Sequence, residues 1–168
     1  LESLVSGRSL TLEEAAAVME EIMTGQAPPA LLGGFLVALR MKGETEEELA
    51  GMARVMRDKA LRVRSPVPVC DVVGTGGDGA HTFNISTAAA LVACGAGLVV
   101  AKHGNRAMSS ACGSADVLEA LGVKIDLGPQ GVERCLGEIG FGFMFAPTFH
   151  PAMKHAAPVR RELGIRTT

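Results

Sequence analysis

Residues 70–110 read CDVVGTGGDGAHTFNISTAAALVACGAGLVVAKHGNRAMSS, and this stretch decides the fold. An apolar run, 67–73, ends in a glycine-rich loop at 74–79, and a second apolar run, 98–101, is followed by the polar residues 102–106. The small-residue segment between them, 86–95, has the composition of a helix. We therefore predict a strand, a glycine loop, a helix, a second strand and a second loop. Ligands of open α/β sheets bind at the carboxyl ends of the strands, so the two loops are the candidate site.

The glycine loop has the properties of an anion site, because glycine lets backbone N–H groups turn toward an anion and the following helix N-terminus adds a partial positive charge. The spacing G-x-G-x-x-G of dinucleotide sites is present formally at residues 74–79. The next strand, however, ends in Lys102 and His103, where a dinucleotide site needs an acidic residue. The ATP-type loop needs Lys and then Ser or Thr after its last glycine, whereas Ala80 and His81 follow here. What remains is a phosphate cradle of a third kind, or a tight turn that only needs glycine.

The composition excludes several classes of function. The chain has 168 residues and a net charge of −2 with both signs mixed, and it contains no Trp or Tyr, which argues against nucleic-acid binding. The cysteines at 70, 94, 112 and 135 have no C-x-x-C spacing, which favours small, buried hydrophobic residues in a reducing compartment. The longest uncharged run, 84–101, is interrupted by glycines, so we interpret it as helix, turn and strand instead of a membrane span. We find no signal peptide and expect a cytoplasmic protein that binds neither membranes nor nucleic acid.

Residues 1–64 are predicted to form a helical domain. Capping boxes of the form Thr-x-x-Glu begin at Thr11 and Thr45, and apolar residues at helical spacing follow each of them. The helix expected over 30–41 is apolar nearly all round, which is typical of burial on more than one side, in a core or against a partner chain.

Residues 65–168 alternate between strand and helix patterns, which predicts the first part of a mainly parallel α/β sheet domain. Beyond the second loop we predict a helix over 114–121, a strand over 123–127, a helix over 129–139, a strand over 141–145 and a mostly helical segment over 150–163. The predicted fold class is therefore α/β, with a small helical domain in front of the sheet.

Five stretches together resemble one family. They are residues 71–78 (DVVGTGGD), 84–87 (NIST), 102–106 (KHGNR), 150–154 (HPAMK) and 160–167 (RRELGIRT), and their order and spacing are similar to those of anthranilate phosphoribosyltransferases over the whole chain. Related nucleoside phosphorylases usually carry Lys-x-Ser-x-Arg in the second loop, where this chain has Gly104-Asn105-Arg106. Members of the family are about twice as long as this chain, so the resemblance identifies it as an N-terminal portion.

The resemblance implies transfer of the phosphoribosyl group from 5-phosphoribosyl 1-pyrophosphate (PRPP) to the amine of anthranilate, giving N-(5-phosphoribosyl)anthranilate and pyrophosphate in tryptophan biosynthesis. It implies a Mg²⁺ cofactor and a homodimer formed through the helical domain. We assign no acid or base, because an aromatic amine is already neutral at physiological pH. The family's adjacent Asp-Glu pair that binds Mg²⁺ has no counterpart in this sequence, so we expect these 168 residues alone to be inactive. A non-catalytic phosphate-binding module and a pyrimidine nucleoside phosphorylase are the alternatives.

Site residues are carried over from the family by position. The resemblance implies contacts with PRPP by Gly74, Gly77, Asp78, Thr82, Asn84, Ile85, Ser86, Thr87, Lys102, His103, Gly104, Asn105, Arg106, Ala107, Met108, Ser109, Ser110 and Ser114. It implies contacts with anthranilate by Gly74, Asn105 and Arg160, and a magnesium ligand at the hydroxyl of Ser86. Lys102 would offer a point charge to a phosphate, and Arg160 a guanidinium fork to the anthranilate carboxylate. The simpler alternatives are that Ser86 and Thr87 only cap a helix and that Arg160 is a solvated charge.

Overall fold

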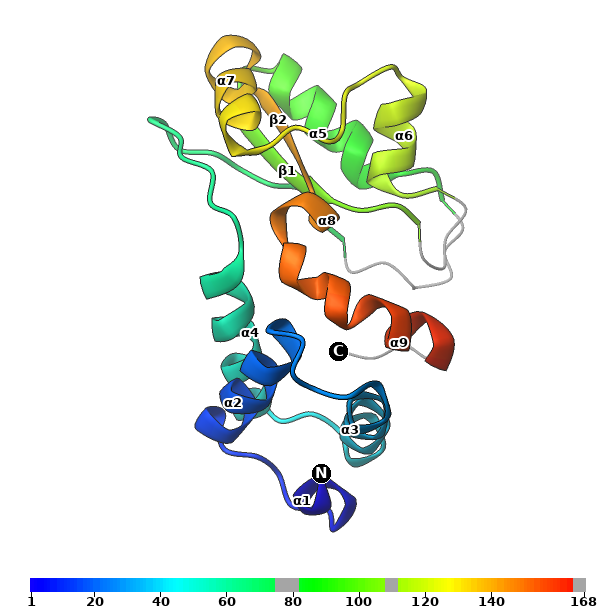
Figure 1. The fold of residues 1–168 in the computed structure, drawn as a ribbon. Helices are drawn as coiled ribbons and strands as arrows, with labels where there is room; N and C mark the ends of the chain where they lie inside the picture. The colour runs from blue at the N-terminus through cyan, green and yellow to red at the C-terminus, as the bar shows by residue number, and fades with distance from the viewer. Residues whose placement is uncertain (75–81, 108–111, 165–168) are drawn as a thin grey trace. The chain divides into compact units, whose positions relative to one another are not determined.

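The computed structural model describes residues 1–74, 82–107 and 112–164 (Figure 1). It divides into two compact units, a helical unit of Leu1–Ala60 with His150–Thr168 and an α/β unit of Leu61–Phe149. The predicted boundary after residue 64 is close to the division between Ala60 and Leu61. The larger difference is in the C-terminal residues, which we predicted to belong to the α/β domain. Residues from His150 onward group with the N-terminal helices, because Ala156 and Val159 belong to the apolar core of that unit.

The helical unit contains α1 (Glu2–Val5), α2 (Leu12–Met23), α3 (Pro29–Lys42), α4 (Glu46–Lys59), the 3₁₀ helix η1 (Pro151–His155) and α9 (Ala157–Leu163). Both predicted capping boxes are confirmed, at the starts of α2 and α4. The apolar helix α3 buries Leu32, Phe35, Leu36 and Leu39 in the core of the unit. Figure 1 shows α2 and α4 side by side, and a glycine at position 51 of α4 lets them approach, because a Cβ there would lie 2.2 Å from the Leu12 carbonyl oxygen.

The α/β unit contains α5 (Ile85–Gly95), β1 (Val100–Gly104), α6 (Ser114–Ala120), α7 (Pro129–Ile139), β2 (Phe141–Phe145) and α8 (Ala146–Phe149). β1 and β2 pair in parallel, with Val100 opposite Phe141 and Lys102 opposite Phe143. Cys70 forms an isolated parallel bridge with Val100, so a third segment lies beside β1. The predicted fold class, α/β with parallel strands after a helical domain, is confirmed.

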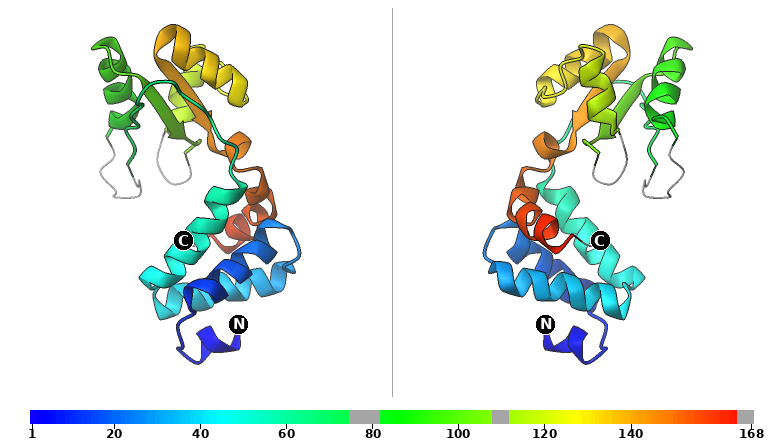
Figure 2. Two further views of the ribbon diagram at one scale, coloured as in Figure 1. Left: turned by 90° about the vertical axis from the view of Figure 1, so that its left-hand side faces the viewer. Right: turned by 90° about the vertical axis from the view of Figure 1, so that its right-hand side faces the viewer.

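Helices cover both faces of this small sheet, and Figure 2 shows α5 and α7 on opposite sides of the strands. α7 packs on the face of Ala101 and Gly142, where a Cβ on Gly142 would lie 2.8 Å from Val132. On the other face Phe143 packs with Ala115 and Leu118 of α6. Because side chains alternate along a strand and Lys102 lies opposite Phe143, Lys102 points to the α6 face.

Two predicted strands differ from the structure, and one predicted helical segment is divided. The strand over 67–73 is reduced to the bridge at Cys70, since Pro68 has no N–H to donate to a ladder. The strand predicted over 123–127 is absent, and Ile125 packs instead with Ala115 and Leu118 of α6 without forming strand pairing. The segment over 150–163 is mostly helical, as predicted, and it is divided into η1 and α9, because prolines at 151 and 158 each stand in the first turn of a new helical segment.

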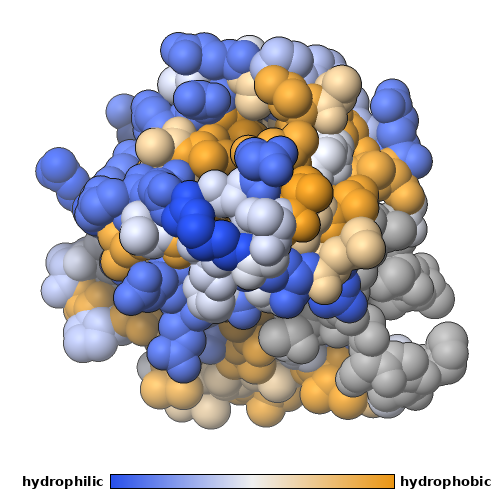
Figure 3. All heavy atoms as spheres, turned by 90° about the horizontal axis from the view of Figure 1, so that it is seen from below, coloured by the Kyte–Doolittle hydropathy of each residue, from blue (hydrophilic) through white to orange (hydrophobic). Residues whose placement is uncertain are grey.

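The surface of the described residues combines polar side chains with exposed apolar side chains and one exposed thiol. Among the described residues, none of the helices combines the length and apolarity that crossing a membrane requires. All four cysteines are free thiols, but the prediction that they are buried is wrong, since three are partly exposed and Cys112 is exposed. Seen from below, the surface mixes hydrophilic and hydrophobic side chains (Figure 3). The helical unit exposes several large apolar side chains, which include Val5 of α1 and Leu31 and Met41 of α3. These residues are available for contact with a partner.

Candidate functional site

The two polar loops follow the ends of neighbouring parallel segments, as predicted. Beside β1, the amide of Cys70 donates to the Val99 carbonyl, and the Cys70 carbonyl accepts from the amide of Ala101. Beyond Cys70, side chains replace this backbone pairing. The His103 amide donates to the Asp71 carboxylate at 3.2 Å, and the Lys102 ammonium donates to the Val72 carbonyl at 2.6 Å. The chain therefore enters the glycine loop held to the end of β1 by two side chains.

Lys102 is almost completely enclosed, with 1% of its surface exposed. Burial lowers the pKa of its ammonium, and the neighbouring Asp71 carboxylate partly opposes that shift. Its hydrogen bond goes to the Val72 carbonyl, two residues before Gly74. In this structure Lys102 therefore supports the backbone that leads into the glycine loop, and its contact with a phosphate stays a prediction.

The start of α5 brings hydroxyl groups beside Gly74. The N-cap of α5 is Asn84, whose side-chain oxygen accepts from the Thr87 amide at 2.9 Å. The alternative that Ser86 and Thr87 merely cap the helix is therefore wrong. A Cβ on Gly74 would lie 3.6 Å from the Ser86 hydroxyl, so the two residues are close neighbours. The buried Thr87 hydroxyl has no hydrogen-bond partner among the described residues, which is unusual for a buried polar group.

The second loop is tied to α6 by carboxylates. One oxygen of Asp116 accepts from the amides of Ala107 and Gly113, at 2.9 and 2.8 Å. These bonds lower the pKa of Asp116. The guanidinium of Arg106 binds Glu119 at 2.7 and 3.0 Å, and it reaches the other oxygen of Asp116 at 3.3 Å. The bonds to Glu119 raise the pKa of Arg106.

Sequence reasoning assigned no role to Asp116 or Glu119 and missed their contacts with the loop. A signal for Asp116 was present, because it stands three residues after Gly113, the spacing of a side chain that reaches back to a helix N-cap. Arg106 was assigned to the phosphoribosyl donor, and the structure places its guanidinium on these carboxylates and 5.8 Å from the centre of the Phe145 ring.

Other predicted donor residues lie at the same ends of the sheet. Gly104 and Asn105 end β1 and begin the second loop, and Ser114 is the first residue of α6. A Cβ on Gly104 would lie 2.9 Å from the Ser114 Cβ, so these two positions are in close contact. Thr82 and Ile85 are exposed beside the start of α5. The predicted donor residues Gly77, Asp78, Met108, Ser109 and Ser110 lie outside the described residues.

Arg160 belongs to the helical unit, on α9, and is partly buried. It lines an apolar cavity of about 230 Å³ whose wall includes Met19, Met52, Met56 and Met153. A guanidinium at the wall of an apolar space suits a ligand that combines an aromatic ring with a carboxylate. Its environment therefore differs from that of a solvated helix charge, the alternative considered from the sequence.

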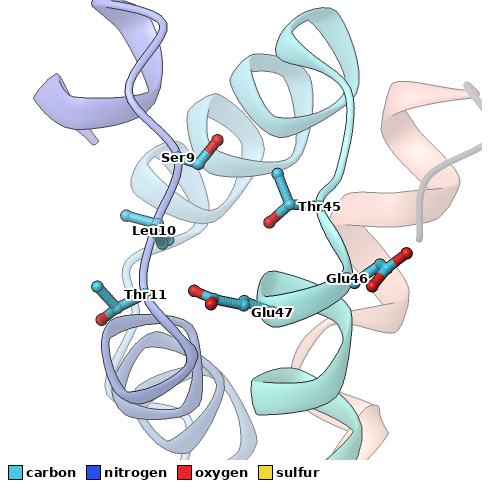
Figure 4. Close-up of a pocket in the computed structure, with 6 residues that line it drawn as sticks. All are labelled: Ser9, Leu10, Thr11, Thr45, Glu46 and Glu47. Carbon is cyan, nitrogen blue, oxygen red and sulfur yellow. The ribbon is translucent and has the colours of Figure 1, made fainter.

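A second depression in the helical unit, of about 420 Å³, lies where α2 and α4 begin (Figure 4). Ser9, Leu10 and Thr11 form one side, and Thr45, Glu46 and Glu47 form the other. Figure 4 shows Glu47 pointing toward the Leu10–Thr11 side and Glu46 pointing away from it. Its charged side chains are carboxylates, which repel phosphate, so we exclude it as a donor site.

The described residues offer little to a metal ion by themselves. Within residues 1–74, 82–107 and 112–164, no group of three or more His, Cys, Asp or Glu side chains is arranged to hold a metal. Ser86 contributes a single hydroxyl beside Gly74. Because Mg²⁺ in proteins usually keeps carboxylate, phosphate and water ligands, this hydroxyl would serve as one ligand in a shell completed by others.

Comparison with protein families gives two matches that together cover most of the chain. Residues 1–60 match the helical bundle domain of a glycosyl transferase family, and residues 67–168 match the a/b domain of a glycosyl transferase family. Similar proteins include the anthranilate phosphoribosyltransferases of Chloroflexus aurantiacus, 70% identical over 165 residues, and of Dehalococcoides mccartyi, 66% identical over 165 residues. Each alignment covers 98% of this chain.

Two solved structures of anthranilate phosphoribosyltransferases are also similar to this chain over nearly its whole length. The anthranilate phosphoribosyltransferase of Thermus thermophilus is 52% identical with a TM-score of 0.88, and the match covers 99% of this chain and 51% of that one. The Saccharomyces cerevisiae enzyme in complex with PRPP and Mg is 32% identical with a TM-score of 0.89, over 99% of this chain and 50% of that one. The chain spans about half the length of the curated relatives it matches, 49% for the Chloroflexus aurantiacus protein.

Proposed function

Since the chain belongs to the glycosyl transferase family whose helical bundle and a/b domains it matches, we propose that it takes part in transferring the phosphoribosyl group of PRPP to anthranilate. The observation that carries the proposal is the closeness of Gly74 and the Ser86 hydroxyl at the start of α5, where the buried Thr87 hydroxyl has no hydrogen-bond partner among the described residues. A glycine backbone and hydroxyl groups at a helix N-terminus suit a phosphorylated sugar. The Saccharomyces cerevisiae relative was solved with PRPP and Mg bound.

In this proposal the α/β unit binds the donor. Leaving of pyrophosphate creates negative charge, so the protein has to stabilise that charge and hold the sugar in position. Asn84 orients the first turn of α5, and Lys102 fixes the backbone before Gly74. Asn105 and Ser114 lie together where β1 ends and α6 begins, since the Ala115 amide donates to the Asn105 carbonyl and a Cβ on Gly104 would touch the Ser114 Cβ. The remaining predicted donor residues, Gly77, Asp78 and 108–110, belong to the proposal by resemblance alone.

We propose that Mg²⁺ binds to the site together with PRPP. When bound, it would neutralise negative charge on the phosphate groups of PRPP. Ser86 is the described residue that would contribute a ligand atom, through its hydroxyl beside Gly74. We also propose that the protein is cytoplasmic and that it forms a homodimer through exposed apolar residues of the helical unit, such as Leu31 and Met41 of α3.

The proposal is tested by following the fluorescence of anthranilate with PRPP and Mg²⁺. The chain is assayed alone and joined to the C-terminal half of the Chloroflexus aurantiacus relative, of which it matches 49%. We expect anthranilate to be consumed by the joined protein and not by the chain alone. Phosphate-dependent cleavage of a pyrimidine nucleoside, without use of anthranilate, would instead establish the nucleoside phosphorylase alternative.

Arg160 provides a residue-level test, because it is proposed to hold the anthranilate carboxylate. In the joined protein, Arg160→Ala should raise the KM for anthranilate about tenfold or more and leave the KM for PRPP nearly unchanged, since one charge-assisted hydrogen-bonded pair is lost. Arg161→Ala is the matched control, because Arg161 is the exposed neighbour on α9. Equal changes in both KM values, or equal effects of the two substitutions, would contradict the assignment.

A further inference from the structure

A single carboxylate oxygen joins two segments of the candidate donor site. The same oxygen of Asp116 accepts from the amides of Ala107, at 2.9 Å, and Gly113, at 2.8 Å. The Ala115 amide adds a bond of 3.2 Å to the Asn105 carbonyl. Two of these bonds, from Ala107 to Asp116 and from Ala115 to Asn105, fasten the segment that leaves β1 to the segment that begins α6, and the bond from Gly113 fixes the Asp116 carboxylate within the second segment.

The two segments approach as closely as backbone atoms allow. A Cβ on Gly113 would lie 2.4 Å from the Ala107 nitrogen and 2.6 Å from the Asn105 carbonyl oxygen. Any side chain at 113 would thus force the segments apart, because real Cβ atoms essentially never approach backbone so closely. Gly113 makes the contact possible and Asp116 holds it.

Ion pairs of Arg106 add to these hydrogen bonds. Arg106 reaches from the loop to the other oxygen of Asp116 and to both oxygens of Glu119. Arg106 and Glu119 are about half exposed, whereas Asp116 is less exposed. Exposed ion pairs contribute little by themselves, so the bonds from Asp116 to the backbone are the stronger constraint.

From this arrangement we infer that Asp116 is a positioning residue of the donor site. It holds Asn105 and Ala107 against Gly113 and Ser114, and so fixes where Asn105 and Ser114 present their side chains to the ligand. The inference rests on the proposed function, because it takes PRPP as the ligand. Asp116 does not touch the ligand in this scheme, and its effect on binding passes through the backbone.

Asp116→Asn is the direct test. An amide has one accepting oxygen, so the variant must turn its NH₂ group either toward the two amides or toward Arg106, and in each case donor meets donor. We expect hydrogen exchange at the Ala107 and Gly113 amides to accelerate roughly ten- to hundredfold, because hydrogen bonds to charged groups are lost. Glu119→Gln is the matched control, since it changes a carboxylate on the same helix and leaves both backbone bonds intact.

The same proteins are titrated calorimetrically with PRPP and Mg²⁺. We expect Asp116→Asn to weaken PRPP binding about tenfold and Glu119→Gln to change it far less. Gly113→Ala is a second perturbation that leaves the carboxylate in place, and it should weaken binding in the same direction by pushing the segments apart.

Two results would overturn the inference. One is unchanged exchange at Ala107 and Gly113 in Asp116→Asn, and the other is faster exchange with unchanged PRPP affinity, which would make the clamp purely structural. If the unsubstituted chain and its joined form both failed to bind PRPP, the proposed function would fail, while the exchange comparison would still decide whether Asp116 holds the two segments.

Discussion

Glu48 and Asp116 hold the backbone in the same way in two different units of the molecule. Each is the third residue of its helix, α4 or α6, and each carboxylate reaches back to the amide of the residue that caps the helix. Each also accepts an amide from outside its helix, Leu10 for Glu48 and Ala107 for Asp116. Each is bound by a basic side chain, Lys42 or Arg106.

The two carboxylates differ in burial and in what they join. Glu48 is fully buried and binds a residue 38 positions earlier in the sequence, so it connects the starts of two core helices. Asp116 is 30% exposed and binds a residue nine positions earlier, so it closes a loop at the proposed site. A carboxylate at the third position of a helix therefore stabilises the fold where water is excluded, at Glu48. The same arrangement positions the residues of the proposed site where the site has to stay open, at Asp116.

The largest expected effect is at Glu48. Glu48→Gln keeps one accepting oxygen but presents an NH₂ group either to the Leu10 amide or to the Thr45 amide and the Lys42 ammonium together, so it leaves buried donors unpaired. We expect a loss of about 3 kcal/mol in the free energy of unfolding, the size found when one partner of a buried ion pair is removed. Urea unfolding followed by circular dichroism measures it, with exposed Glu47→Gln as the control. A loss no larger than that of the control would break the comparison.

Lys102 extends the comparison to a basic side chain that holds a backbone carbonyl. Lys102→Met preserves the length and removes the donor, so the Val72 carbonyl loses its charged partner. We expect a loss of about 2 kcal/mol in the free energy of unfolding, typical of a hydrogen bond from a charged group. Urea unfolding checks it, and Lys124→Met, which alters a lysine outside these contacts, is the control. An unchanged free energy of unfolding would show that the ammonium does not stabilise the backbone before Gly74.

Acidic pH should lower the stability of the wild-type chain more steeply than that of Glu48→Gln. Hydrogen bonds from Leu10, Lys42 and Thr45 lower the pKa of Glu48 below its ordinary value of 4.5, although burial acts in the opposite direction. A carboxylate with a lowered folded pKa stabilises the fold above its unfolded pKa, and that contribution is lost as pH falls through the folded value. Below pH 4.5 the wild type should therefore lose stability more steeply than Glu48→Gln. Thermal unfolding at a series of acidic pH values measures this, and parallel curves would contradict it.

The sequence predicts the capping boxes of α2 and α4 but not the contacts of Asp116, and the difference has a physical reason. The boxes at Thr11 and Thr45 follow the Thr-x-x-Glu pattern, so the starts of α2 and α4 were predicted correctly. The clamp at Asp116 has a glycine as its N-cap, and its second partner, Ala107, becomes visible only in three dimensions. A backbone amide has no sequence signature, so partners of this kind cannot be found from residue types.

Burial limits prediction in a second way. Lys102 was identified as a site residue from its motif, but its charge alone gave no sign that it is enclosed and bound to the Val72 carbonyl. The strand predicted over 123–127 failed for a related reason. Its alternating apolar residues satisfy the strand pattern, but a strand also needs a neighbour to pair with, and Ile125 found apolar contacts without one.

The smallest expected effect compares the two threonine caps. The Thr11 hydroxyl accepts from the Glu14 amide, whereas the Thr45 hydroxyl both accepts from the Glu48 amide and donates to the buried Glu48 carboxylate at 3.1 Å. Replacing a threonine cap by alanine costs about 1 kcal/mol on average. We expect Thr11→Ala to fall somewhat below that value and Thr45→Ala above it, because the second change also removes a donor from a buried charge. Urea unfolding of the two variants side by side measures the difference. Equal losses would mean that the surroundings of Glu48 add nothing to its cap, and the contrast between buried and exposed carboxylates would then rest on Leu10 and Lys42 alone.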